Sequence, residues 1–379
     1  MSDLNRIRRE MDAVLRPEGA HPDRNLKITR RIFIQKSIMT GAAAGAATCG
    51  LFPIMNGIEV AYGAEAPFSF AWISDTHLYP KTVNTRFVEK TVQAVKDVKA
   101  MSPAADFLIF GGDIAQLGDP VELDLGNEIL KELTIKKVYI PGEHDWYLDM
   151  GKKWEKLFGD PNWTFDHKGV RFIGLDTISR APDYWTAKKM SPEERMGHMA
   201  TLDGTVAGAW AGVGKDQLDW MAKTLSDWDK ARPVIIFSHN PLYEYYPPWN
   251  FWVRDWRDVQ EVLKPYANVT NIHGHVHQAL YNEIGTMRSI GMLATSWPWP
   301  YAPEGVPALT TPQIRTDPGN HYDGVGWNTL TFGADGRTET KYNIWGRTEP
   351  LATAEADDGT ADNVNQRVHP RIADNQWPY

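Results

Sequence analysis

The sequence has 379 residues, of which 42% are hydrophobic, so it can bury one large core or two smaller ones. Its formal net charge is −8, and because residues 1–63 hold nine Lys and Arg against six Asp and Glu, the remaining chain carries −11. An acidic body without a basic stripe argues against binding to nucleic acid, although bound metal cations could still attract an anionic substrate. The single cysteine, Cys49, excludes an intrachain disulfide, a thiolate zinc site and an iron–sulfur cluster.

The first 63 residues contain the features of a targeting segment. Arg30 and Arg31 precede a weakly hydrophobic run over 37–54 that is rich in Ala and Gly. This arrangement resembles a twin-arginine export signal, which implies an interaction with the twin-arginine export machinery and a periplasmic or otherwise exported protein. Ala61-Tyr62-Gly63 places small residues at the two cleavage-site positions, so that the mature chain would begin near Ala64.

Other interpretations of this segment are a basic amphipathic N-terminus and an uncleaved membrane anchor. The run is interrupted by Gly and by Pro53, and it lacks the sustained apolarity of a spanning helix, so we expect no stable membrane span in the mature chain. A lipid anchor on Cys49 is less well supported, because Ala46 stands where such signals usually have Leu.

From residue 67 onward, short apolar runs alternate with amphipathic helical patterns, which is typical of an α/β domain. The runs predict buried strands at 68–74, 106–110, 137–140, 171–175, 233–237 and 268–272. Helices are predicted over 84–101, over 119–133 and around 218–228. After residue 277, strands without helices are predicted at 279–284, 286–294, 325–332 and 338–344. We therefore predict one domain over residues 67–347 and a polar, irregular tail over 348–379.

Five of the six apolar strands before residue 277 run directly into a polar cluster. The clusters are Asp75-Thr76-His77, Gly111-Gly112-Asp113, Gly142-Glu143-His144-Asp145, His239-Asn240-Pro241 and Gly274-His275-Val276-His277. Each cluster alone is weak evidence, since an isolated Asp-x-His is usually a turn. In an open α/β sheet, however, ligands gather beyond the carboxyl ends of the strands, so the five clusters together predict one metal site. His273 shares the alternation of the last cluster, and a hydrogen-bonded structural role is expected for it.

The order Asp-x-His, Gly-Asp, Gly-x-His-Asp, His, Gly-His-x-His resembles the calcineurin-like metallophosphoesterase superfamily over about residues 67–347. The resemblance implies an α/β fold in which two mixed β-sheets pack face to face, flanked by helices, as a four-layer sandwich. It also implies these ligand roles: Asp75, His77 and His277 on one metal, His239, His275 and Glu143 on the other, and Asp113 bridging the two. His144 matches the histidine that assists the leaving oxygen, and Asp145 matches the carboxylate that orients it.

This resemblance implies hydrolysis of a small-molecule phosphate ester, either a phosphomonoester or a phosphodiester, through a metal-bridging hydroxide. Two cations would neutralise the phosphate oxygens and deprotonate the attacking water near neutral pH. Imidazole and carboxylate ligands suit Fe, Mn or Zn better than Ca or Mg, so two divalent or mixed-valence transition-metal ions are expected. A serine hydrolase is excluded, because the sequence has no Gly-x-Ser-x-Gly motif.

The sequence departs from the family pattern at Glu143, where the motif normally has Asn. With two divalent ions, Asp75, Asp113 and Glu143 leave a formal charge of +1, whereas the Asn motif leaves +2, which should weaken phosphate binding or favour a trivalent ion. The alternative function is therefore a metal-bound but catalytically weak protein that serves binding or assembly in the envelope.

Aromatic residues are concentrated over 243–256 and over 297–301. One interpretation is a proline-stiffened loop that packs its own rings. The other is a substrate wall that stacks on a base, a ring or an acyl group.

Overall fold

The computed structural model describes residues 64–80, 82–178, 185, 188–199, 211–245, 251–299, 324–333, 338–345 and 377–378. The chain divides into two compact units, Met1–Glu59 and Val60–Tyr379, and every described residue belongs to the second. The predicted export segment therefore lies outside the described residues. Within the described part, no helix is both long and apolar enough to cross a membrane.

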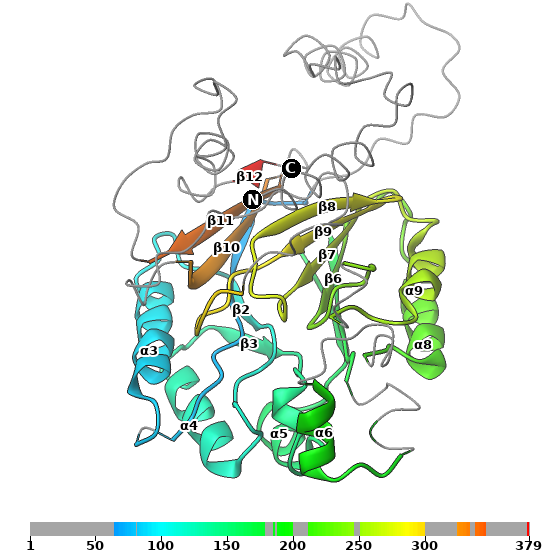
Figure 1. The fold of residues 1–379 in the computed structure, drawn as a ribbon. Coiled ribbons are helices and arrows are strands. Elements are labelled where there is room, and N and C mark those ends of the chain that lie inside the picture. Colours follow the sequence, from blue (N-terminus) through cyan, green and yellow to red (C-terminus); the bar gives the residue numbers. More distant parts are fainter. Residues whose placement is uncertain are drawn as a thin grey trace, which may run out of the picture. The chain divides into compact units, whose positions relative to one another are not determined.

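The first sheet is mixed and has the strand order β12–β11–β10–β1–β2–β3 (Figure 1). Its members are β1 (Phe68–Ile73), β2 (Phe107–Phe110), β3 (Lys136–Tyr139), β10 (Gly326–Phe332), β11 (Thr338–Ile344) and β12 (Trp377–Pro378). Strands β1, β2 and β3 run parallel, whereas β10 pairs antiparallel with β1. The carboxyl ends of the three parallel strands therefore meet at one edge of this sheet.

The second sheet is also mixed, in the order β4–β5–β6–β7–β9–β8. Its members are β4 (Trp163–His167), β5 (Val170–Leu175), β6 (Val234–Ser238), β7 (Val269–His273), β8 (Leu280–Ile284) and β9 (Met287–Gly291). Strands β5, β6, β7 and β9 run parallel, and β4 and β8 pair antiparallel at the two edges.

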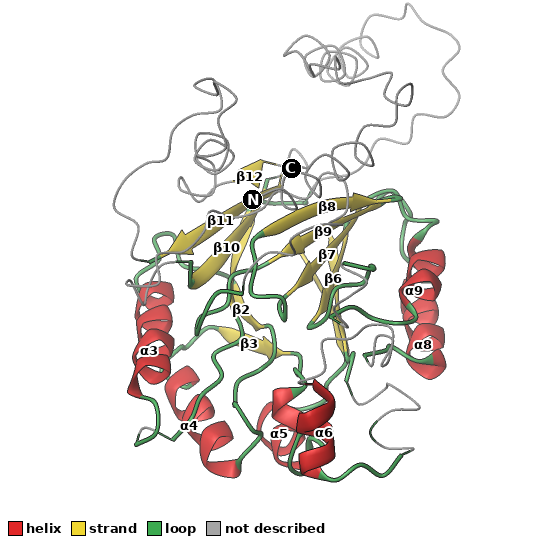
Figure 2. Ribbon diagram, in the orientation of Figure 1, coloured by secondary structure: helices red, strands yellow, loops and turns green. Residues whose placement is uncertain are grey.

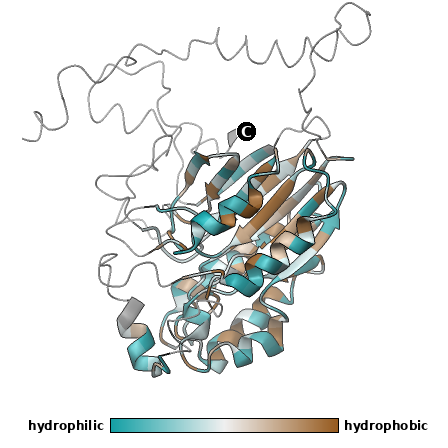
Figure 3. Ribbon diagram, turned by 90° about the vertical axis from the view of Figure 1, so that its right-hand side faces the viewer, coloured by the Kyte–Doolittle hydropathy of each residue, from teal (hydrophilic) through white to brown (hydrophobic). Residues whose placement is uncertain are grey.

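An apolar core lies between the two sheets, because alternate residues of the strands of both sheets pack against each other there. This core is made by Phe68, Phe70, Trp72, Phe107, Phe172, Phe237, Ile272 and Leu330, among others. The intervening residues point outward: Ala71 and Phe110 on the first sheet and Ile173 on the second belong to a separate apolar cluster with the helices. Figure 3 shows the resulting concentration of hydrophobic residues in the strands.

Helices flank the two sheets at their sides and below them (Figure 2). They are α3 (Thr85–Lys99), α4 (Pro120–Leu130), α5 (Lys152–Phe158), α6 (Pro192–Met199), α8 (Lys215–Leu225) and α9 (Trp256–Leu263), together with the short 3₁₀ helix η1 (His144–Trp146). Helix α4 begins as its sequence predicts, since Asp119 and Glu122 form a reciprocal capping box around Pro120. The predicted fold, two face-to-face mixed sheets with flanking helices, is confirmed.

Candidate metal centre

The predicted ligands all come from loops that follow the carboxyl ends of strands. Asp75 and His77 follow β1, Asp113 follows β2, and Glu143 follows β3 in the first sheet. In the second sheet, His239 follows β6, and His275 and His277 follow β7. Because each set of strands is parallel and the two sheets pack together, these loops meet at one end of the sandwich.

The backbone at these loops is strained. Of eight described non-glycine residues with positive φ, five are predicted ligands: Asp75 (52°), His77 (44°), Asp113 (54°), His275 (65°) and His277 (51°). Left-handed conformations cost free energy in residues other than glycine and persist only where the surroundings enforce them. Backbone hydrogen bonds supply part of that enforcement, such as the one from the His77 N–H to the Asp113 carbonyl (3.0 Å). Such strain is typical of a functional site.

Glycine is required beside two of the carboxylates. A Cβ atom at Gly142 would lie 2.0 Å from Oδ1 of Asp113, and one at Gly274 would lie 2.7 Å from Oδ2 of Asp75. The glycines of these two motifs therefore let the backbone pass directly beside the candidate ligands.

The structure brings Asp75, His77 and His277 together as a first ligand group, all buried. Nε2 of His277 lies 3.3 Å from Oδ1 of Asp75, and 3.1 Å from Nε2 of His77. The ligand atoms of the group lie within 4.8 Å of one another, which is close enough for a single ion.

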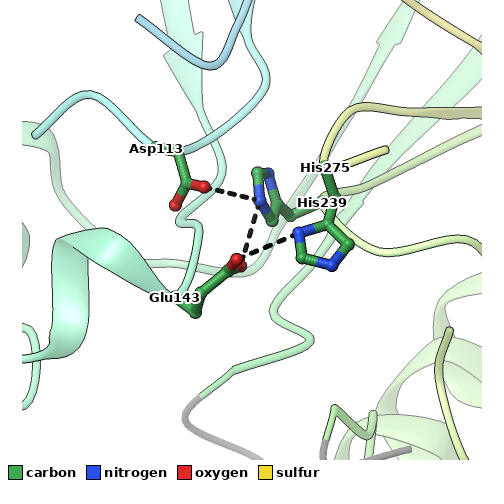
Figure 4. Close-up of side chains that lie close together, drawn as sticks. All are labelled: Asp113, Glu143, His239 and His275. Carbon is green, nitrogen blue, oxygen red and sulfur yellow. Dashed lines mark ion pairs between the residues drawn. The ribbon is translucent and has the colours of Figure 1, made fainter. Parts of the chain in front are cut away.

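A second ligand group consists of Asp113, Glu143, His239 and His275, again all buried. Glu143 lies between the two histidines: Oε2 is 3.1 Å from Nε2 of His239, and Oε1 is 3.0 Å from Nδ1 of His275 (Figure 4). The Glu143 side chain thus lies where it could bind the same ion as the two histidines, as the resemblance implied.

Asp113 connects the two groups. Its Oδ2 lies 3.2 Å from Nε2 of His239 in the second group and 3.6 Å from Nε2 of His77 in the first. This placement is the one that a bridging carboxylate requires, because a single side chain then contacts ligands of both ions.

The hydrogen bonds of the rings show that these groups suit a cation. Nδ1 of His239 lies 2.7 Å from the Gly111 carbonyl, and Nδ1 of His277 lies 2.7 Å from the Trp297 carbonyl. Since a carbonyl oxygen only accepts, each Nδ1 carries a hydrogen, and Nε2, which faces the carboxylates, is the atom whose lone pair would bind an ion. Lone pairs and carboxylates that converge in this way repel one another unless a cation lies between them. The donor set therefore fits bound metal.

The pKa shifts of the metal-free groups also indicate that these buried carboxylates favour a positive charge beside them. Burial disfavours a charged His239, but the nearby Asp113 and Glu143 carboxylates outweigh burial and raise the pKa of His239 well above its usual value. Burial likewise opposes ionisation of Glu143, but His275 and His239 hold its pKa well below the usual range. A proton on His239 thus supplies positive charge that a metal ion could replace, so metal binding should release protons.

His144 lies beside the ligands, with its side chain 19% exposed. Its Nδ1 is 2.6 Å from the Gln116 carbonyl, which leaves Nε2 as the atom available to a substrate. Gln116 also places its side-chain oxygen 3.0 Å from Nδ1 of His77. Sequence reasoning missed Gln116, although it is a polar residue only three positions after Asp113.

Asp145 has partners other than the His144 ring that the resemblance implied. Its carboxylate is buried and accepts hydrogen bonds from the backbone N–H groups of Ala115 (3.0 Å) and Gly142 (3.1 Å). Asp145 therefore ties the Asp113 loop to the Glu143 loop, and the Gln116 carbonyl is the group that orients His144. The role that the resemblance implied for Asp145 stays a prediction.

A cavity of about 290 Å³ opens over the two ligand groups. Its floor is formed by ligands and His144, and its walls by Leu117, Tyr147, Met196, Phe251, Trp297 and Trp299. The packing interpretation holds for Tyr243 and Tyr245, which are buried and hydrogen-bond to Asn282 and Gln278, whereas Phe251 lines the cavity, where the substrate-wall interpretation stays a prediction. Residues 246–250 lie outside the described part.

His273 has the structural role expected of it. It is fully buried, its Nδ1 lies 3.1 Å from the Gly274 carbonyl, and burial lowers its pKa to about 4, so the ring is neutral.

The chain is similar to several known phosphoesterases. A family model described as calcineurin-like phosphoesterase matches residues 68–279. A probable glycerophosphodiester phosphodiesterase of Arcobacter nitrofigilis is 24% identical over 228 residues, covering 56% of this chain and 74% of that protein. A probable cyclic nucleotide phosphodiesterase of Synechococcus is 24% identical over 247 residues, covering 63% and 85%. A dimetal phosphatase from Danio rerio shares the fold, with a TM-score of 0.52, 16% identity, and coverage of 72% and 95%.

Proposed function

The chain belongs to the calcineurin-like phosphoesterase family, whose model matches more than half of it, and we propose from this premise that it is an exported hydrolase of phosphomono- or phosphodiesters that works with two metal ions. The observation that carries the proposal is the pair of buried ligand groups joined by Asp113. The two curated relatives are both named as phosphodiesterases, which supports this reaction class.

We infer a division of labour among the residues. Asp75, His77 and His277 would hold one ion, Glu143, His239 and His275 the other, and Asp113 would contact both. When bound, two such ions neutralise phosphate oxygens and activate water for attack.

His144 would hold a proton on Nε2 for the departing ester oxygen, while the Gln116 carbonyl keeps the ring in place through Nδ1. Asp145 would keep the Asp113 and Glu143 loops at a fixed separation through its two backbone hydrogen bonds. None of these contacts needs to form during the reaction, which is how preorganised sites lower the barrier.

Metal analysis combined with a hydrolysis assay tests this function. Protein isolated from its own export route should contain two ions of Fe, Mn or Zn per chain and should hydrolyse aryl phosphate esters. Two bound ions without turnover of any monoester or diester would reject the proposed reaction and favour a binding protein.

Glu143→Gln should strengthen phosphate inhibition and move the pH–rate profile toward acid. The substitution keeps the side-chain length and an oxygen for the second ion but removes one negative charge. A unit charge about 4 Å away is worth about 4 kcal/mol at an effective dielectric constant of 20, so tightening of about tenfold or more is expected even after screening. Inhibition constants, pH–rate profiles and metal content should be measured on the same samples.

Two further variants separate charge from length at this position. Glu143→Asn removes the charge and shortens the side chain, whereas Glu143→Asp shortens it and keeps the charge. If Glu143→Gln retains both ions and its profile does not move, then the charge of Glu143 has no influence on the site. If Glu143→Asn alone loses metal, then the length of the side chain decides whether residue 143 can bind the ion.

We also propose export by the twin-arginine route. The support is the pair Arg30–Arg31 ahead of an apolar, Ala- and Gly-rich run. Replacing both arginines with lysine should leave the precursor in the cytoplasm, as measured by cell fractionation. The matched control is Arg8→Lys with Arg9→Lys, an arginine pair that no such run follows. Normal periplasmic accumulation of the Arg30, Arg31 variant would reject this route.

A further inference from the structure

The wall of the cavity is aromatic above both ligand groups. The Phe251 ring lies edge-on to His275 of the second group, with ring centroids 4.9 Å apart, and edge-on to Trp299 at 5.8 Å. The Trp297 ring lies 4.1 Å from the His77 ring of the first group. If the phosphorus of an ester lies over the ions, its substituents would therefore contact these aromatic rings.

Fixed cations are absent from the described lining of this cavity. Two basic residues lie nearby, but both are engaged by backbone carbonyls: Lys90 donates to Ser296, and Arg195 donates to Tyr147 and Met190. Because the described wall adds no lysine or arginine, the positive charge available to a substrate comes mainly from the ions.

Three carboxylates already offset that charge, namely Asp75, Asp113 and Glu143. Two divalent ions would leave one net positive charge. This charge matches a phosphodiester, which is a monoanion, whereas a phosphomonoester dianion would find neither a matching net charge nor, among the described lining residues, an Arg or Lys that could bind its extra charge.

The cavity is also large enough for a ring beside the phosphate. Its volume is about 290 Å³. An apolar cavity of about 150 Å³ is known to accept benzene, so a ring of that size and a phosphate group fit together.

We propose that the substrate is a phosphodiester that carries a flat, uncharged ring on one ester arm, and that Phe251 and Trp299 bind this ring. The inference rests on the proposed function, because it concerns the same cavity and the same ions. Phe251 and Trp299 would then determine specificity, since they contact the ring without contacting the reacting atoms.

Three substrates with the same leaving group test this inference: phenyl 4-nitrophenyl phosphate, methyl 4-nitrophenyl phosphate and the monoester 4-nitrophenyl phosphate. The two diesters carry the same charge and differ in the arm that stays on phosphorus. Burying a phenyl ring should raise kcat/KM by roughly 10- to 100-fold over methyl, because the free energy gained by fully burying a large apolar side chain corresponds to a factor of that size. The monoester should have a lower kcat/KM than the phenyl diester.

Variants of Phe251 and Trp299 then test whether these residues bind the phenyl ring. Trp299→Leu and Phe251→Leu should each lower the ratio of phenyl to methyl kcat/KM several-fold while two ions per chain are retained. The control is Trp220→Leu on α8, a half-buried tryptophan outside the cavity, which should leave the ratio unchanged.

The outcomes separate the two levels of the proposal. Absence of turnover on all three esters by protein with two bound ions would reject the hydrolase itself. Turnover with a phenyl to methyl ratio near one, or a ratio that Trp299→Leu and Phe251→Leu leave unchanged, would reject the ring-binding wall and leave the hydrolase standing. A preference for the monoester would overturn the charge argument.

Discussion

Asp113→Ala is expected to remove bound metal and hydrolysis together. Asp113 is the carboxylate that lies within 3.6 Å of His77 in one ligand group and within 3.2 Å of His239 in the other. Its loss should therefore weaken both ion positions. Turnover should fall by roughly 10³-fold or more, because metal ions supply several kcal/mol of transition-state stabilisation and each 1.36 kcal/mol corresponds to a factor of ten.

Asp75→Ala is the informative comparison for this prediction. Asp75 belongs to the first ligand group, so its removal should lower the metal content toward one ion per chain, whereas Asp113→Ala should lower it further. Asp106→Ala is the control, because Asp106 pairs with His167 and Lys168 outside the site, and it should retain both ions. An Asp113→Ala protein with two ions and full turnover would remove the bridging assignment.

The sequence predicted the layout of the site because its ligands follow strongly apolar strands. Strands such as β2 and β6 are buried along their whole length, so their continuous apolar runs are easy to recognise. Each run ends in the polar cluster that forms the site, and the parallel pairing of the strands brings the clusters together. The α/β class and the set of convergent residues therefore follow from local pattern, whereas the face-to-face packing of two mixed sheets was implied by the family resemblance.

Elements with a mixed pattern were missed. Strand β4 alternates between half-buried and exposed residues at the edge of its sheet, so it lacks the apolar run that marks the other strands. Helix α9 begins at Trp256, the last residue of the aromatic stretch, whose proline- and ring-rich pattern resembles a loop. The C-terminal tail, which was predicted to be irregular, contains β12. This strand was missed because it forms by pairing with β11, which is distant in sequence.

Side-chain partners within the site were harder to predict than the site itself. Asp145 bonds to backbone N–H groups of Ala115 and Gly142, and such bonds leave no mark on the sequence because every residue offers the same donor. The left-handed backbone at Asp75 and His77 is likewise invisible to pattern, since glycine is the residue expected there.

His144→Ala should lower turnover by roughly 10²–10⁴-fold while both ions stay bound. The ring lines the cavity beside the ligands, and its Nδ1 is held by the Gln116 carbonyl, so Nε2 can present a proton to the departing oxygen. Aryl esters with good leaving groups need little protonation, whereas alkyl esters need much. The loss should therefore be greater on alkyl esters than on 4-nitrophenyl esters, as measured by kcat on matched pairs of substrates.

Two controls distinguish proton donation from loss of structure. His167→Ala removes a histidine that pairs with Asp106 outside the cavity, so it should leave kcat and metal content unchanged. Added imidazole should partly restore the His144→Ala enzyme on alkyl esters, because the space left by the ring opens onto the cavity. Equal losses on both classes of ester, without rescue by imidazole, would mean that His144 supports the ligand loops and donates no proton.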